Sequence, residues 1–101
     1  MTRRDIYIGR SYPFRGFKVR LVDGEKVRDT ISVDFTCGDN DQHSSFVPKG
    51  EIWIDSCLSP KDAAATLLHE FTEVGLMAKG QTYGMAHDAA NKIERAFRRQ
   101  S

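Results

Sequence analysis

The chain contains little cysteine and no long apolar run. Its 101 residues include two cysteines, Cys37 and Cys57, which do not form a Cys-x-x-Cys pair. Two thiols are too few for a disulfide framework, and in a reducing compartment they stay free. No apolar stretch approaches the roughly 20 residues of a membrane-spanning helix, and the N-terminus lacks the apolar segment of a secretory signal. We therefore expect a cytoplasmic protein with no membrane partner.

An excess of charge of either sign is also missing. Fifteen lysines and arginines stand against 14 aspartates and glutamates, which gives a formal net charge of +1. A chain this close to neutrality sets up no strong field toward a polyanion, so nucleic acid is not an expected partner. Hydrophobic residues make up 40% of the sequence. That content and this length predict one domain, residues 1–101, with a modest core.

The first half of the chain has the pattern of strands. A short apolar run covers residues 6–8, and residues 17–22 alternate apolar and basic side chains. The pair Asp23-Gly24 is typical of a tight turn, and alternation resumes over residues 27–35. We expect residues 17–22 and 27–35 to pair as a β-hairpin.

A polar stretch separates these strands from the next. Residues 37–45, Cys-Gly-Asp-Asn-Asp-Gln-His-Ser-Ser, indicate a surface loop. Residues 51–55, Glu-Ile-Trp-Ile-Asp, are rich in strand formers and predict a short strand. Trp53 alone does not distinguish a strand inside the sheet from a strand at its edge.

The second half of the chain predicts two helices. Ser59 and Pro60 have the residue types of an N-cap and a first helical position, and Lys79-Gly80 suits the helix end. Thr82 is a plausible cap for the last helix. The expected packing positions are Ala64, Leu67, Leu68, Phe71 and Val74 on the first helix, and Ala86, Ala89, Ala90, Ile93 and Phe97 on the second. The predicted class is α+β: a small, mostly antiparallel sheet of three or four strands, followed by two helices.

One motif on the first of these helices carries metal-site chemistry. His69 and Glu73 are four residues apart, so both side chains leave the same helix face, one turn above the other. Glu70 lies next to the histidine. The spacing is that of the His-Glu-x-x-His motif of zinc proteases, with Glu73 at the fifth position.

Counting ligands predicts the third metal-binding group. Catalytic zinc sites use three protein ligands, and two histidines with one carboxylate are an established set. His69 and Glu73 supply one of each, so the missing ligand is a histidine, and His87 on the following helix is available. Zinc is the expected metal, although the same trio also holds ferrous iron.

The run GEIWIDSCLSPKDAAATLLHEFTEVGLM resembles the edge strand, connecting loop and active-site helix of small zincin-like metallopeptidases. The resemblance covers about the second half of the chain, and it is greatest to the minimal single-domain gluzincins. It implies that His69 is the first metal ligand and Glu70 the general base. It makes Glu73 the second ligand, where the family has a histidine.

The resemblance also implies a third ligand and a place for the substrate. The family's third ligand is a glutamate from a following helix, which would fall at Glu94, whereas we favour His87 because it restores two histidines to the set. In zincin-like enzymes the strand that corresponds to residues 51–55 lies at the sheet edge beside the metal. An extended peptide or protein substrate would then pair with Glu51–Asp55; an interior strand is the alternative.

These assignments predict a zinc-dependent peptide-bond hydrolase. Glu70 takes a proton from water and returns it to the leaving amine. Tyr83, one turn before His87, is a candidate hydrogen-bond donor to the developing oxyanion. The alternative function is a catalytically inactive zincin-like module that keeps the fold and the metal and binds or regulates a protein, in a phage or mobile-element setting.

Overall fold

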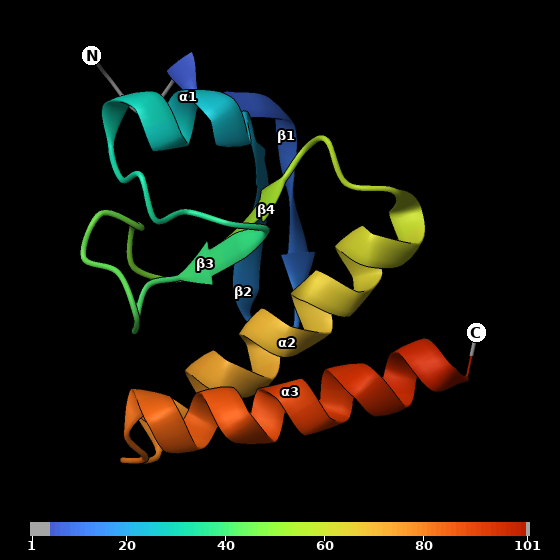
Figure 1. Cartoon of the computed structure of the whole chain (residues 1–101). Coiled ribbons are helices and arrows are strands. Elements are labelled where there is room, and N and C mark those ends of the chain that lie inside the picture. The colour runs from blue at the N-terminus through green and yellow to red at the C-terminus, as the bar shows by residue number, and fades with distance from the viewer. Residues whose placement is uncertain (1–4, 101) are drawn as a thin grey trace.

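The computed structural model describes residues 5–100. The elements in chain order are β1 (Tyr7–Phe14), β2 (Phe17–Val22), α1 (Gly24–Thr30), β3 (Gly38–Asn40), β4 (Glu51–Asp55), α2 (Pro60–Ala78) and α3 (Tyr83–Arg99) (Figure 1). The α+β class is as expected, with one more helix than the sequence predicted. None of the helices in this described part of the chain is long and apolar enough to cross a membrane.

The four strands form one mixed sheet in the order β1-β2-β4-β3. The β1–β2 and β3–β4 pairs are antiparallel, and the β2–β4 pair is parallel. Strand β4 is therefore interior, and the expectation that Glu51–Asp55 forms a sheet edge is wrong. Residues 52–55 are all buried, which is typical of a strand covered on both faces. The edge beside α2 is β3.

Helix α1 replaces the expected second strand of a hairpin. The Asp23 side chain accepts a hydrogen bond from the backbone N–H of Lys26 at 3.1 Å and so caps a helix instead of forming a hairpin turn. Val27 and Ile31 are four residues apart, and both pack into the same apolar cluster. The alternation over residues 27–35 thus also contains a helical spacing. Strand β2 pairs with β1 instead.

Two apolar clusters lie on opposite faces of the sheet, because successive strand residues point to opposite sides. Trp53 belongs to the cluster that includes Val27 of α1. Ile52 and Ile54 belong to the cluster that includes Val74 of α2. The members of the first cluster are Ile6, Val22, Val27, Phe35, Val47 and Trp53. Each face of the sheet is thus covered by a different helix.

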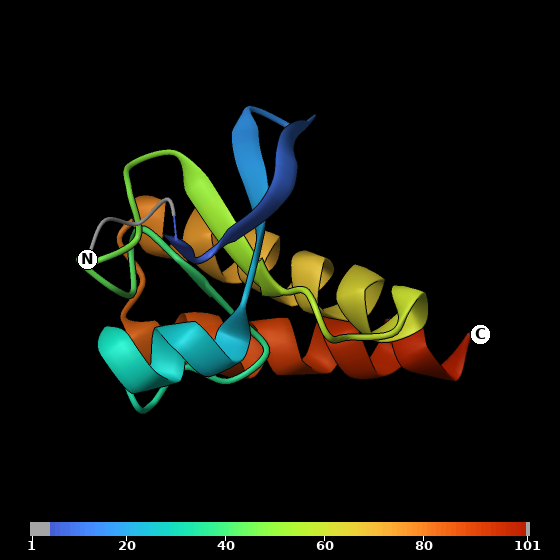
Figure 2. The same cartoon turned by 90° about the horizontal axis from the view of Figure 1, so that it is seen from above.

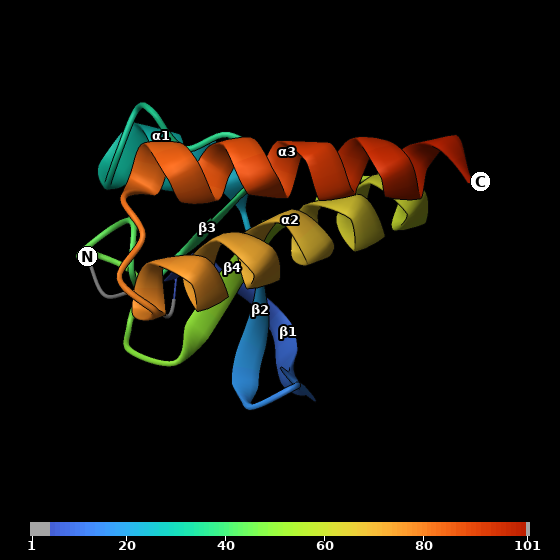
Figure 3. The ribbon, with the colours of Figure 1, turned by 90° about the horizontal axis from the view of Figure 1, so that it is seen from below.

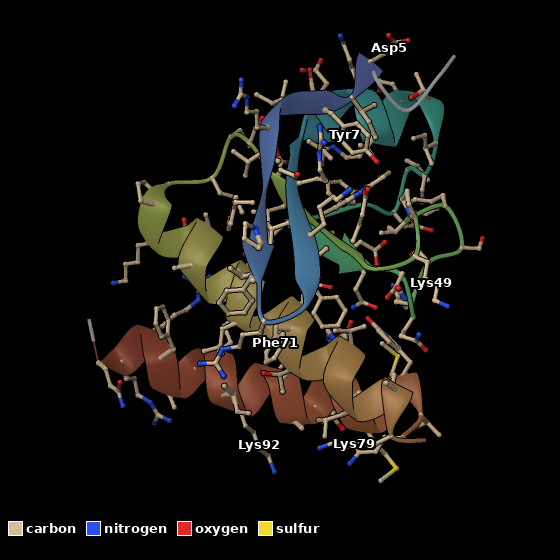
Figure 4. All side chains as sticks on the ribbon, turned by 180° about the vertical axis from the view of Figure 1, so that it is seen from behind. Asp5, Tyr7, Lys49, Phe71, Lys79 and Lys92 are labelled. Atoms are coloured by element: carbon tan, nitrogen blue, oxygen red, sulfur yellow. The ribbon has the colours of Figure 1, made fainter. Side chains whose placement is uncertain are left out.

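Helix α2 packs on the sheet through Phe71. The Phe71 ring meets the rings of Phe14 and Phe17 edge-on, with centroids 5.2 and 5.9 Å apart, beneath the β1–β2 hairpin (Figure 4). Leu67, like Phe71, packs against the apolar cluster that includes Val74. Ala64, which we expected at a packing position, is exposed. The packing face of α2 is therefore rotated from the predicted one, and its buried positions include His69, Glu70 and Glu73.

Helices α2 and α3 begin at the predicted caps. Ser59 accepts a hydrogen bond from the Asp62 N–H at 3.2 Å, and Thr82 accepts one from the Met85 N–H at 3.2 Å. The two helices run antiparallel, and α2 lies between the β1–β2 hairpin and α3 (Figures 2 and 3).

Small side chains form the contact between these helices. Ala86 and Ala90 of α3 are fully buried, which allows the close approach of α3 to α2 that the sequence indicated. Ile93 is 42% exposed, so its expected packing role is wrong. Lys79 and Lys92 extend away from the helix pair (Figure 4).

Candidate metal centre

The structure brings together His69 and Glu73 of α2 and His87 of α3. Glu73 Oε2 lies 3.2 Å from His69 Nε2 and 2.8 Å from His87 Nδ1. One ligand atom from each of the three side chains falls within 4.8 Å of the others. Among residues 5–100 this is the one group of three or more such side chains that can hold a metal ion. The trio is the one that ligand counting predicted.

The chemistry of this trio fits a divalent metal. Burial opposes ionisation of Glu73, but hydrogen bonds to His69 and His87 outweigh it and lower the Glu73 pKa. The hydrogen bond to Glu73 raises the His69 pKa against the opposing effect of burial. Hydrogen bonds connect these three side chains. A cation would bind to the same side chains and take the place of the hydrogen-bonding protons. Two imidazoles and one carboxylate suit zinc and also ferrous iron.

Glu70 lies beside the trio and is 6% exposed. Burial, together with the nearby charge of Glu73, raises the pKa of Glu70 to about 8, although a hydrogen bond from Asn40 lowers it. A carboxyl group whose pKa lies near neutrality is suited to both taking and returning a proton. With a pKa of about 8, Glu70 holds its proton at neutral pH in the metal-free protein.

Glu94 lies behind His69 and outside the trio. Its Oε1 is 2.9 Å from Nδ1 of His69, the ring nitrogen that faces away from Glu73. The two atoms are at ion-pair distance but not aligned as a hydrogen bond. The other oxygen of Glu94 accepts a hydrogen bond from Arg98 Nε at 2.8 Å. His87, and not Glu94, thus completes the group, and Glu94 lies at ion-pair distance from the far side of the His69 ring.

Sequence reasoning missed Asn40. The stretch 37–45, expected to be a surface loop, contains strand β3, in which Asn40 is fully buried. Its Nδ2 donates hydrogen bonds to Glu70 Oε1 at 2.9 Å and to Glu73 Oε1 at 3.1 Å. The two glutamates that Asn40 bonds lie 30 residues or more away in the sequence. Because a polar run by itself indicates solvent exposure, no local signal marks this asparagine as buried.

Two further side chains reach the site from outside α2. The Tyr83 hydroxyl lies 3.3 Å from His87 Nδ1, and its ring makes stacked contacts with the rings of His87 and His43. Burial raises the Tyr83 pKa, so the hydroxyl keeps its proton and can donate it to a hydrogen bond. The buried carboxylate of Asp39 lies 2.9 Å from Nδ1 of His43 and orients that ring. The expected donor Tyr83 is therefore at the site, and His43 is a neighbour that the sequence did not indicate.

These groups, apart from Asn40, line one pocket of about 360 Å³. Its wall is formed by residues 34–39, α2 and α3, and it includes the metal trio, Glu70, Tyr83 and His43. Strand β3 contributes Gly38 and Asp39 to this wall.

Comparison of the chain with protein-family models, curated proteins and solved structures finds no match in any of the three. Of the resemblance to zincin-like peptidases, the structure shows the His69–Glu73–His87 group, which can hold a metal ion.

Proposed function

We propose that the chain is a zinc-dependent peptide-bond hydrolase. The observation that carries the proposal is the convergence of His69, Glu73 and His87 beside the buried carboxyl group of Glu70, in a pocket open to solvent. When bound, zinc supplies a Lewis acid that polarises a carbonyl oxygen and lowers the pKa of water. Ferrous iron is the second metal that this ligand set suits.

Glu70 and Tyr83 supply the proton and hydrogen-bond chemistry of the proposed reaction. Glu70, in its ionised form, takes a proton from the attacking water and returns it to the leaving amine. The Tyr83 hydroxyl donates a hydrogen bond to the oxygen on which negative charge develops. Its place beside His87 supports that role.

Strand β3 is the proposed site for the substrate backbone. Within the described residues 5–100 it has a sheet neighbour on one side only, and Gly38 and Asp39 line the pocket. An extended peptide can pair with the free edge of such a strand through main-chain hydrogen bonds. The substrate strand that the sequence placed along Glu51–Asp55 is therefore moved to β3, because β4 is interior.

Metal content and peptide turnover test the proposal together. We expect near-stoichiometric zinc in the wild-type protein, loss of zinc in His69→Ala and in His87→Ala, and cleavage of a peptide library by the wild type alone. Glu70→Gln should retain zinc and lose turnover by about a hundredfold or more. Asp88→Asn, an exposed acid next to His87, is the matched control and should behave as the wild type. Absence of zinc after reconstitution would overturn the proposal.

A metal-binding module without catalysis is the second candidate function. It is favoured by the burial of Glu70 and by the hydrogen bond in which Asn40 engages its Oε1 atom. Both features are also those of a glutamate that stabilises the fold and takes no part in catalysis. Zinc binding without turnover of any peptide, and with no difference between the wild type and Glu70→Gln, would establish this module instead.

A further inference from the structure

Asn40 has a fixed orientation beside Glu70 and Glu73. Its Oδ1 accepts hydrogen bonds from the backbone N–H groups of Gln42 and His43, both at 3.0 Å. These two bonds determine which end of the amide faces the loop and which faces α2. The Nδ2 end is therefore directed at α2, and the residue is fully buried.

The Nδ2 end divides its two protons between two carboxyl groups. It donates to Glu70 Oε1 at 2.9 Å and to Glu73 Oε1 at 3.1 Å. Because Oε1 of Glu73 is engaged, Oε2 is the oxygen that faces His69 Nε2 and His87 Nδ1. An amide side chain has two donor protons and one acceptor oxygen, and here every one of them is used.

We propose that Asn40 is the positioning residue of the metal centre: it holds Glu73 so that a single oxygen, Oε2, is presented to the metal, and it fixes Glu70 beside that oxygen. The inference rests on the proposed metal centre and adds a residue from the sheet to it. Asparagine is suited to this role because it is neutral and donates twice. An aspartate of the same shape would turn an acceptor toward two carboxyl groups.

The first test is the substitution Asn40→Asp. It keeps the oxygen that the loop N–H groups need, and it replaces the donor that faces α2 by a carboxylate oxygen, which accepts hydrogen bonds and carries negative charge. We expect the zinc Kd to rise by about 10- to 100-fold. We also expect the visible absorption of the Co²⁺-loaded protein to change, since the freed Oε1 alters the ligand field. Asn91→Asp, on α3 outside the pocket, makes the same chemical change and should leave both quantities at their wild-type values. An unchanged Kd and spectrum in Asn40→Asp would overturn the proposal.

The second test uses the wild-type protein and does not depend on the folding of a variant. Side-chain amide exchange followed by ¹⁵N NMR compares Asn40 with Asn91. We expect the Asn40 amide protons to exchange at least about tenfold more slowly, both without metal and with zinc bound. Equal exchange rates for the two side chains would overturn the proposal.

These results separate the two proposals. Zinc binding that Asn40→Asp weakens, without peptide turnover, would support the positioning role and remove the hydrolase. Peptide turnover with the zinc affinity unchanged in Asn40→Asp would leave the hydrolase and remove the positioning role. A wild-type protein that binds no metal would overturn both.

Discussion

At the scale of single residues, the candidate site places acidic groups where they oppose folding. Glu70 and Glu73 are 6% and 2% exposed and stand close enough to be joined by one asparagine side chain. Burial of a carboxyl group disfavours its charged form, and a neighbouring carboxylate adds to this effect. For Glu73 the two imidazoles compensate, whereas for Glu70 the result is a raised pKa. Binding of a cation or a proton would thus relieve the unfavourable burial of these two carboxyl groups.

Glu70 should make the stability of the metal-free protein depend on pH. Its pKa is about 8 in the folded protein, against 4.5 for an unperturbed group. Between these values the folded state holds a proton that the unfolded state has released, so the free energy of unfolding falls as pH rises through this range. Glu70→Gln has no proton to lose and should lack this part of the decline.

Chemical denaturation with a chelator present, at about pH 6 and about pH 9, measures the effect as a difference between variant and wild type. Glu25→Gln, which neutralises an exposed acid on α1, should follow the wild-type decline. Parallel pH dependence in the wild type and Glu70→Gln would show that Glu70 is not buried as described.

At the scale of elements, sequence reasoning succeeded where the signal is local. The caps Ser59 and Thr82 are the residues at which the sequence placed them, because a cap needs only the backbone within three residues. The i, i+4 spacing put His69 and Glu73 on one face. His87 followed from the number of ligands that a zinc site needs. These arguments require no knowledge of the sheet.

The same reasoning failed where tertiary contacts decide the structure. Strand β3 lies within a polar run, and its burial depends on α2 and β4, which come later in the chain. The position of β4 inside the sheet results from parallel pairing with β2, which leaves no mark in its own residues. Helix α1 was missed because Val27 and Ile31 fit both an alternating and a helical pattern. The role of Asn40 likewise exists only once β3 has docked.

The close approach of β3 to its neighbours should make Gly38 irreplaceable. A Cβ atom at Gly38 would lie 2.8 Å from the backbone oxygen of Trp53, 2.7 Å from Thr66 Cγ2 and 3.3 Å from Glu70 Cγ. Because a backbone oxygen cannot rotate away, Gly38→Ala should displace β3. We expect a loss of about 1–3 kcal/mol in the free energy of unfolding, measured by urea denaturation, together with weaker zinc binding.

Gly75 of α2 provides the matched control for this change. A Cβ atom there meets nothing within 4 Å, and alanine is favoured over glycine in a helix interior by about 1 kcal/mol. Gly75→Ala should therefore be neutral or stabilising. If Gly38→Ala were as stable as Gly75→Ala, β3 would not lie as close to α2 and β4 as the structure places it.

At the scale of the whole molecule, α3 is the one helix among residues 5–100 that contributes no side chain to either apolar cluster. The sheet has a cluster on each face, while α3 packs chiefly on α2, with Ala86 and Ala90 as its fully buried residues. Three polar contacts join α3 to α2: His87 with Glu73, Glu94 with His69, and Arg98 with Asp62. The last is a partly exposed pair of the kind that contributes little to stability. The other two involve candidate metal-site residues of α2.

Zinc should therefore stabilise the attachment of α3 more than any other part of the fold. A metal that takes ligands from both helices links them, and its binding free energy adds to the stability of the closed arrangement. Amide hydrogen exchange measures this element by element. We expect zinc to slow exchange along Tyr83–Arg99 and to change β2 and β4 much less, because their strands are paired and covered on both faces.

Two controls assign this effect to the proposed ligands. His87→Ala should abolish the response of α3 to zinc, and Mg²⁺, which prefers oxygen ligands, should not reproduce it in the wild type. A uniform slowing of exchange throughout the sheet and helices would instead mean that α3 opens only when the whole molecule unfolds. In that case α3 would be part of a single cooperative unit, and the metal would stabilise the domain as a whole instead of joining a separable helix to it.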